Sequence, residues 1–159
     1  MATILQQRGI CVEGAKIEYF PVTAGLTFYA GEMLYITSTA GRVQECSSDC
    51  TVTCGMAAAD NAAAAVDTLV PVYVPTPNTR YEFNVYHGTP ASATTAKVLV
   101  GNSYNIFAGT KVMYVDRNDQ TVPFFKIEKL SEKDVEGDLF GRVIVSIVPE
   151  VAQVAKSLD

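Results

Sequence analysis

Short apolar or alternating runs, each closed by glycine, proline, asparagine or serine, dominate this chain of 159 residues. The clearest alternation runs from residue 80 to residue 86. Its aromatic and aliphatic residues at odd positions are expected to face a core, and Glu82 and Asn84 to face water. Other β-branched and aromatic runs occupy residues 16–22, 110–115, 124–130 and 141–148. This pattern predicts an all-β fold, a compact antiparallel barrel or sandwich that could be divided into two small lobes.

The same pattern suggests where the β domain begins and ends. Residues 1–16 have little periodicity and are predicted to be an N-terminal arm, followed by a β domain over 17–148. Residues 149–159 are predicted to form a C-terminal arm or short helix, because Pro149 suits a first helical position. The polar, small-residue segment 87–96 lacks an apolar period and predicts a mobile loop or a hinge.

Composition limits the classes of partner. The formal net charge of -5, with basic residues scattered along the chain, argues against binding to a nucleic-acid backbone. No apolar run approaches the roughly twenty residues of a membrane helix, so we expect no membrane partner. The N-terminal residues lack the apolar core of a secretory signal, which predicts folding in a cytoplasm with the cysteines as thiols.

Three cysteines at even spacing, Cys46, Cys50 and Cys54, are the strongest hint of chemistry, with Cys11 as a distant fourth. Structural zinc usually takes tighter cysteine pairs or a paired histidine, and neither follows here. A strand over 50–54 with buried, apolar cysteines is the better interpretation. A disulfide from Cys46 to Cys50 or to Cys54 in an oxidising medium is an open alternative. We therefore expect no metal and no cofactor.

The sequence offers little for catalysis. His87 is the single histidine, and it precedes a glycine in a segment that predicts a turn. No serine lies in a Gly-x-Ser-x-Gly elbow. The acidic segment 132–138 lacks the ligand order of a calcium loop and predicts a solvated hairpin turn. We expect that the protein is not an enzyme; a small enzyme using His87 or a thiol is the least favoured hypothesis.

Several glycine-punctuated β runs share an order with a known group of virion proteins. In the first half they are Ala30–Ile36, Gly41–Glu45, Gly55–Asp60 and Val70–Val74. In the second half they are Val100–Ile106, Gly109–Asp116, Phe124–Glu128 and Gly141–Ile147. Over roughly residues 20–148 the chain resembles the small β-rich capsid decoration, or cement, proteins of tailed bacteriophages and related prophage virion proteins.

The resemblance implies a structural protein that adds to the outside of an assembled capsid in the host cytoplasm. Its partners would be the major capsid protein and itself, as a homotrimer, and its location the exterior of the virion. A protein that binds only the intact shell stabilises that shell by mass action. Contacts with the capsid are expected at the chain ends and loop tips, at Ile4, Leu5, Arg8, His87, Thr89, Val151, Val154 and Leu158.

A second function remains open from sequence. The eight tyrosines would suit a half-wet binding surface, so the chain could be a glycan- or receptor-binding β module of a virion fibre or appendage. The absence of tryptophan weakens the sugar-binding interpretation. Most of these tyrosines are expected to lie on strands at the rim of the core.

Overall fold

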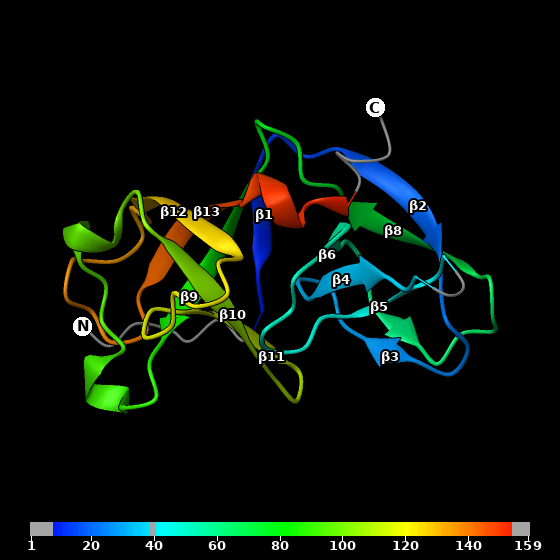
Figure 1. The fold of residues 1–159 in the computed structure, drawn as a ribbon, viewed down its shortest axis with the longest axis horizontal. Coiled ribbons are helices and arrows are strands. Elements are labelled where there is room, and N and C mark those ends of the chain that lie inside the picture. Colours follow the sequence, from blue (N-terminus) through cyan, green and yellow to red (C-terminus); the bar gives the residue numbers. More distant parts are fainter. Residues whose placement is uncertain (1–7, 39–40, 154–159) are drawn as a thin grey trace.

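A computed structural model describes residues 8–38 and 41–153 of the chain. Figure 1 shows two β structures side by side, a closed five-stranded mixed barrel and a separate antiparallel five-stranded sheet. The predicted all-β class is therefore confirmed. Within the described ranges, the named elements besides strands are three single-turn 3-10 helices, η1 (Pro90–Ser92), η2 (Lys97–Leu99) and η3 (Pro149–Val151).

The barrel is built from the second half of the chain. Its strands are β9 (Arg80–Tyr86), β10 (Ser103–Gly109), β11 (Val112–Asp116), β12 (Phe125–Leu130) and β13 (Arg142–Ile147). They follow the order β9-β11-β10-β12-β13, and pairing of β13 with β9 closes the ring. The β9–β11 pair is parallel and the others are antiparallel. A further strand, β1 (Ile10–Glu13), pairs with the start of β9.

The first half of the chain forms the separate sheet. Its strands are β2 (Ile17–Pro21), β4 (Met33–Ile36), β5 (Val43–Glu45), β6 (Gly55–Ala57) and β8 (Leu69–Tyr73). Their order is β2-β8-β6-β4-β5, and two short strands, β3 (Thr27–Phe28) and β7 (Asn61–Ala62), pair beside them. One face of this sheet covers a small core that includes Phe28, Leu34 and Val72.

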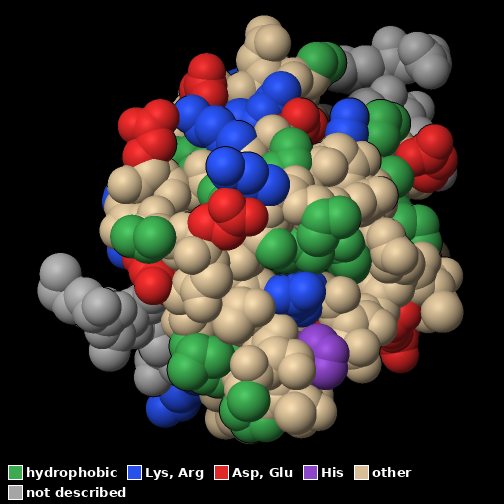
Figure 2. Space-filling view, turned by 90° about the vertical axis from the view of Figure 1, so that its left-hand side faces the viewer, with side chains coloured by type: hydrophobic (Ala, Val, Ile, Leu, Met, Phe, Trp, Pro, Cys, Tyr) green, Lys and Arg blue, Asp and Glu red, His purple; other side chains and the backbone are tan. Residues whose placement is uncertain are grey.

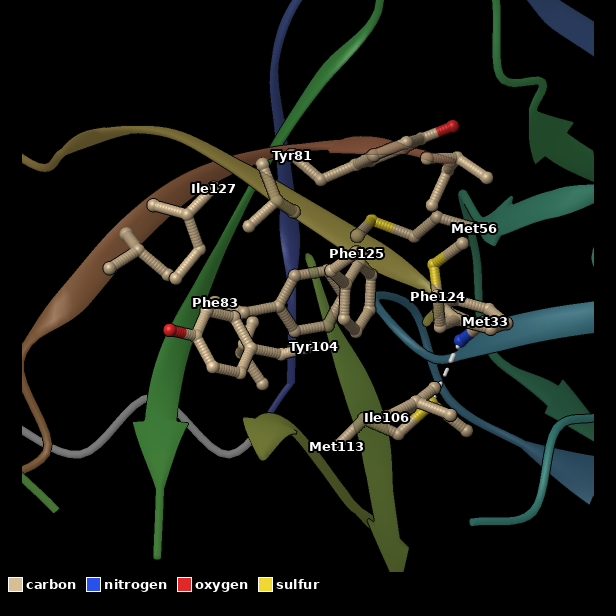
Figure 3. Close-up of a cluster of buried hydrophobic side chains, with 14 of the residues drawn as sticks. Met33, Met56, Tyr81, Phe83, Tyr104, Ile106, Met113, Phe124, Phe125 and Ile127 are labelled. Carbon is tan, nitrogen blue, oxygen red and sulfur yellow. Dashed lines mark hydrogen bonds between the residues drawn. The ribbon is translucent and has the colours of Figure 1, made fainter. Parts of the chain in front are cut away.

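The two β structures share one larger hydrophobic core. The side chains of Met33 in β4 and Met56 in β6 extend from the five-stranded sheet and pack among the buried aromatic residues of the barrel, including Phe124 and Phe125 (Figure 3). The backbone N–H of Met33 also donates to the sulfur of Met113, at 3.0 Å. Methionine suits this junction because its flexible, polarizable side chain fills irregular gaps between packed elements.

The segment after the last barrel strand fastens the five-stranded sheet to the barrel. The N–H of Thr53 donates to the carbonyl of Val151 at 2.7 Å, and the N–H of Gln153 donates to the carbonyl of Thr53 at 2.8 Å. The Gln153 amide accepts from the N–H of Ile36 at 2.8 Å and donates to its carbonyl at 2.9 Å. This side chain thus satisfies both backbone groups of the last residue of β4.

Several sequence predictions need correction in detail. In β9 the expected inward residues are buried, but Glu82 and Asn84 are buried as well, because a later loop covers the outer face of the strand. The predicted N-terminal arm includes β1, and Gly9 lies so close to Met56 and Phe83 that a Cβ would meet their side chains at 2.4 Å. Glycine is required at position 9 because the chain is closely packed there, and not because it forms a flexible arm.

Two predicted segments also differ from expectation. Residues 50–54 do not form a regular strand, because Thr53 pairs with Ala152 of the C-terminal segment in an isolated bridge. Residues 87–96 connect β9 to β10 within the one barrel, so they do not separate the two β structures. This connection contains η1, and Ala93 and Thr95 within it are buried.

We predict that Gln153→Ala lowers the free energy of unfolding by about 2 kcal/mol, because the N–H and carbonyl of Ile36 lose their partners. Urea unfolding of the whole protein measures the change. Gln120→Ala is the matched control, since that exposed amide makes a single bond of 3.4 Å. Equal stability of the two variants would contradict the fastening role of Gln153.

Candidate functional site

Two connections meet at one end of the barrel. One is residues 87–102, between β9 and β10, and the other is residues 131–141, between β12 and β13. Backbone hydrogen bonds join them: the N–H of Gly137 donates to the carbonyl of Thr95 at 2.9 Å, and the N–H of Phe140 donates to the carbonyl of Ala93 at 2.5 Å. The segments lie about 40 residues apart in sequence but form one surface.

This surface exposes four apolar side chains, and we call it the barrel-end surface: Val98, Val100, Val135 and Leu139. Val98 and Val135 are the most exposed large hydrophobic residues in the described part of the chain, at 75% and 72%. Figure 2 faces this end of the molecule and shows green hydrophobic side chains at the surface. Figure 2 also shows Lys, Arg, Asp and Glu side chains between them, so this end of the molecule presents both apolar and charged groups. Exposed apolar side chains with a polar rim can mark a protein interaction site.

An ion pair between a buried carboxylate and a half-exposed lysine holds the 131–141 connection against the barrel. Glu82, on the outer face of β9, is 1% exposed. Its carboxylate accepts from Lys133 Nζ at 2.8 Å and from the hydroxyl of Ser131 at 2.9 Å. A buried carboxylate needs such partners to offset its desolvation. Glu82 therefore fixes the start of the connection that carries Val135.

A second ion pair closes the same connection at its other end. The Arg142 guanidinium donates to both carboxylate oxygens of Asp134, from Nε at 2.7 Å and from Nη2 at 2.8 Å. The Arg142 backbone N–H adds a third bond at 2.9 Å. The side-chain bonds from Arg142 are the main cause that lowers the pKa of Asp134 below its ordinary value, while partial burial opposes them.

The structure brings His87 and Thr89 of the predicted contact set to this same connection. The N–H of Thr89 donates to Nδ1 of His87 at 2.9 Å, which is the local turn expected before Gly88. Figure 2 shows the single histidine on the same face as the exposed hydrophobic side chains. Arg117 anchors the connection further along, because it donates to the hydroxyl of Thr94 at 3.0 Å.

The remaining predicted contact residues are not brought to the barrel end. Arg8 donates to the carbonyls of Ala30 at 3.2 Å and Lys111 at 3.0 Å, where the β10–β11 turn meets the five-stranded sheet. Val151 is 7% exposed and belongs to the shared core, so its side chain is a packing residue rather than a surface contact. Ile4, Leu5, Val154 and Leu158 lie outside the described residues.

Sequence reasoning missed a second apolar surface on the five-stranded sheet. On the face of the β2–β8 pair that turns away from the small core, one stretch of uncharged residues is left uncovered, and we call it the sheet surface: Ile17, Tyr19, Pro21, Leu69 and Pro71. Tyr73, on the same face, packs against the shared core instead. Tyr19 is 64% exposed and Leu69 is 61% exposed. The signal in the sequence was that every residue of β8, and every residue of β2 except Glu18, is uncharged, so that both faces of the pair carry apolar side chains.

A hollow of about 330 Å³ lies between the β10–β11 turn and the five-stranded sheet. Glu32 and Glu45 line it together with Tyr29 and Lys111. Burial is the main cause that raises the pKa of Glu32 above its ordinary value, and the charge of Glu45 adds to the effect. Across residues 8–38 and 41–153, no three His, Cys, Asp or Glu side chains are grouped to hold a metal ion.

The described residues include no helix long and apolar enough to cross a membrane. A scan of protein-family models and a search of curated proteins found no match to this chain. The barrel-end surface, with its exposed apolar side chains on pinned connections, thus supplies the main evidence for a functional interpretation.

We predict that Asp134→Asn destabilises the protein by about 2 kcal/mol at pH 7, because the charge-assisted bonds with Arg142 weaken. The folded pKa of Asp134 lies below the unfolded value of about 3.9, so its contribution to stability is complete only above about pH 5. That contribution is lost as the pH falls through the folded pKa.

Urea unfolding between pH 7 and pH 2.5 measures this dependence, and the difference between wild type and Asp134→Asn should shrink at the acid end. Glu132→Gln is the control, since its side chain is 92% exposed and its ion pair with Lys129 is 4.0 Å long. A difference that stays constant over the whole pH range would exclude the ionised Asp134 as its source.

Proposed function

We propose that the protein is a capsid decoration, or cement, protein that binds the outside of an assembled phage capsid through its barrel-end surface. The observation that carries the proposal is the exposure of Val98 and Val135 on two ordered connections. Glu82 and Asp134 pin the connection that carries Val135, and backbone hydrogen bonds join the connection that carries Val98 to it. A surface that is already ordered loses little conformational entropy when it binds. Burial of its apolar side chains against a capsid subunit then favours association.

The charge of the protein is compatible with this location. A formal net charge of -5 suits the outer face of a shell, away from packaged DNA. Binding to the assembled shell alone would stabilise that shell against disassembly by mass action. The role in this proposal is mechanical, and it assigns no catalytic step and no cofactor to the chain.

We also propose that the protein associates with itself as a homotrimer through the sheet surface. Two acidic copies repel each other at long range, so a contact between them is favoured where charge is absent. The outward face of β2 and β8 meets this condition, because Tyr19, Leu69 and their neighbours on that face are uncharged. The barrel-end surfaces of the copies then remain available for the capsid.

The double variant Val98→Asp, Val135→Asp should bind empty capsids of the source phage at least about tenfold more weakly than wild type. Each aspartate would place an unpaired charge in the contact. Co-sedimentation over a range of protein concentrations measures the affinity, and thermal unfolding confirms that the variant is folded. Val66→Asp is the control, since Val66 is 49% exposed and lies outside the barrel-end surface.

If the Val98→Asp, Val135→Asp variant binds capsids as tightly as wild type, the barrel-end surface is not the capsid contact. Quantitative mass spectrometry of purified particles supplies the complementary test. We expect a copy number of the same order as that of the major capsid protein. A handful of copies per particle would instead support a fibre or appendage, and absence from the particle would overturn the virion assignment.

The sheet surface has its own test. We expect light scattering on the purified protein to give the mass of a trimer, and the double variant Tyr19→Asp, Leu69→Asp to give the mass of a monomer. The barrel-end double variant is the matched control and should remain a trimer. A monomeric wild-type protein, or a trimer that survives both sheet-surface substitutions, would contradict the proposed contact.

A further inference from the structure

Two of the four cysteines are in contact in the segment after β5. The sulfurs of Cys46 and Cys50 are 3.1 Å apart, and both thiols are free. A disulfide bond is about 2.05 Å long, so a shift of about 1 Å would bring the sulfurs to bonding distance. The geometry therefore selects Cys50 from the two partners of Cys46 that the spacing of the cysteines left open.

The other two cysteines are held elsewhere. Cys54 is fully buried in the small core of the five-stranded sheet, and its sulfur lies 3.5 Å from the carbonyl of Leu34. Cys11 lies on β1, with its sulfur 3.9 Å from the carbonyl of Glu13. Neither contact directs a thiol toward the Cys46–Cys50 pair.

The two thiols of the pair differ in access and in acidity. Cys50 is partly exposed, whereas Cys46 is 2% exposed. The hydrogen bond between the two sulfurs is the main cause that lowers the pKa of Cys50 to about 7, so a large fraction of Cys50 is thiolate at neutral pH. Burial raises the pKa of Cys46 well above its ordinary value. The accessible, nucleophilic sulfur of Cys50 thus contacts the protonated thiol of Cys46.

The surrounding contacts hold the start of this segment in place. The N–H of Cys46 donates to the carbonyl of Met33 at 2.8 Å, which extends the pairing of β4 and β5. The hydroxyl of Ser48 accepts from the N–H of Ala108 at 2.9 Å and so ties the turn to β10 of the barrel. The Cys46–Cys50 pair therefore lies where the five-stranded sheet meets the barrel.

We propose that Cys46 and Cys50 are a reactive dithiol that undergoes exchange with small-molecule disulfides and closes as an intramolecular disulfide. The Cys50 thiolate attacks one sulfur of oxidised glutathione, which forms a mixed disulfide and releases one glutathione thiolate. Cys46 then loses its proton to solvent and attacks the Cys50 sulfur, and the second glutathione thiolate leaves. Two protein thiols are oxidised and one small disulfide is reduced to two thiols. This inference is independent of the proposed capsid role.

The test is treatment of the folded, reduced protein with oxidised glutathione at pH 7.5, followed by alkylation and mass spectrometry. We expect wild type to lose two thiols without keeping a glutathione adduct, and peptide mapping to show a Cys46–Cys50 disulfide. Cys46→Ser should instead accumulate a stable adduct on Cys50, because no second thiol displaces it. Cys50→Ser should not react at Cys46, which is buried.

Cys54→Ser is the matched control and should behave as wild type, since its sulfur is not in the pair. A wild-type protein that resists oxidation, keeps a stable adduct, or forms its disulfide through Cys11 or Cys54 would overturn the proposal. Thermal unfolding adds a second readout. The oxidised wild type should unfold at a higher temperature than the reduced form, and treatment of Cys50→Ser should leave its transition unchanged.

Discussion

Burial of β9 on both faces is the constraint on which the rest of the structure depends. At Glu82 this strand pairs with β1 on one edge and with β13 on the other, and further along it takes β11 as a parallel partner. Its inward side chains, such as Phe83, form the middle of the barrel core. On its outward side the Glu82 carboxylate holds the connection that carries Val135. One strand therefore closes the barrel and also positions its exposed end.

The regular parts of this fold follow from local patterns in the sequence. Alternation over residues 80–86 predicts β9, and the runs at 124–130 and 141–148 predict β12 and β13 with boundaries within a residue or two. The burial of Glu82 was not predictable in this way. Its partners Ser131 and Lys133 lie about 50 residues later, and alternation contains no information about which face a distant loop will cover.

The same limit applies to the irregular segments. Thr53 lies in a run that alternates as a strand would, but it pairs with the C-terminal segment instead of a neighbouring strand. In the candidate site, the position of the 87–96 connection at a surface was predictable from its polar, small residues. The acidic segment 132–138 was predicted as a solvated turn, yet Asp134 pairs with Arg142 while Val135 is exposed. The available signal for an exposed apolar contact in this segment was Val135, a single valine among charged residues.

The sheet surface and the barrel-end surface lie toward opposite ends of the molecule. In Figure 1, β2 and β8, which carry the sheet surface, are at the right, and the 3-10 turns η1 and η2, in the connection that carries Val98, are at the left. Because Met33 and Met56 join both β structures in one core, the distance between these surfaces is fixed. A contact with only four apolar side chains at its centre is small for a stable interface. In the proposed trimer, three barrel ends would engage the shell together, and their joint binding would exceed the affinity of any one of them. In this proposal, weak single contacts and self-association would be two parts of one mechanism, because the shared core would let one sheet contact hold each barrel end at a fixed place.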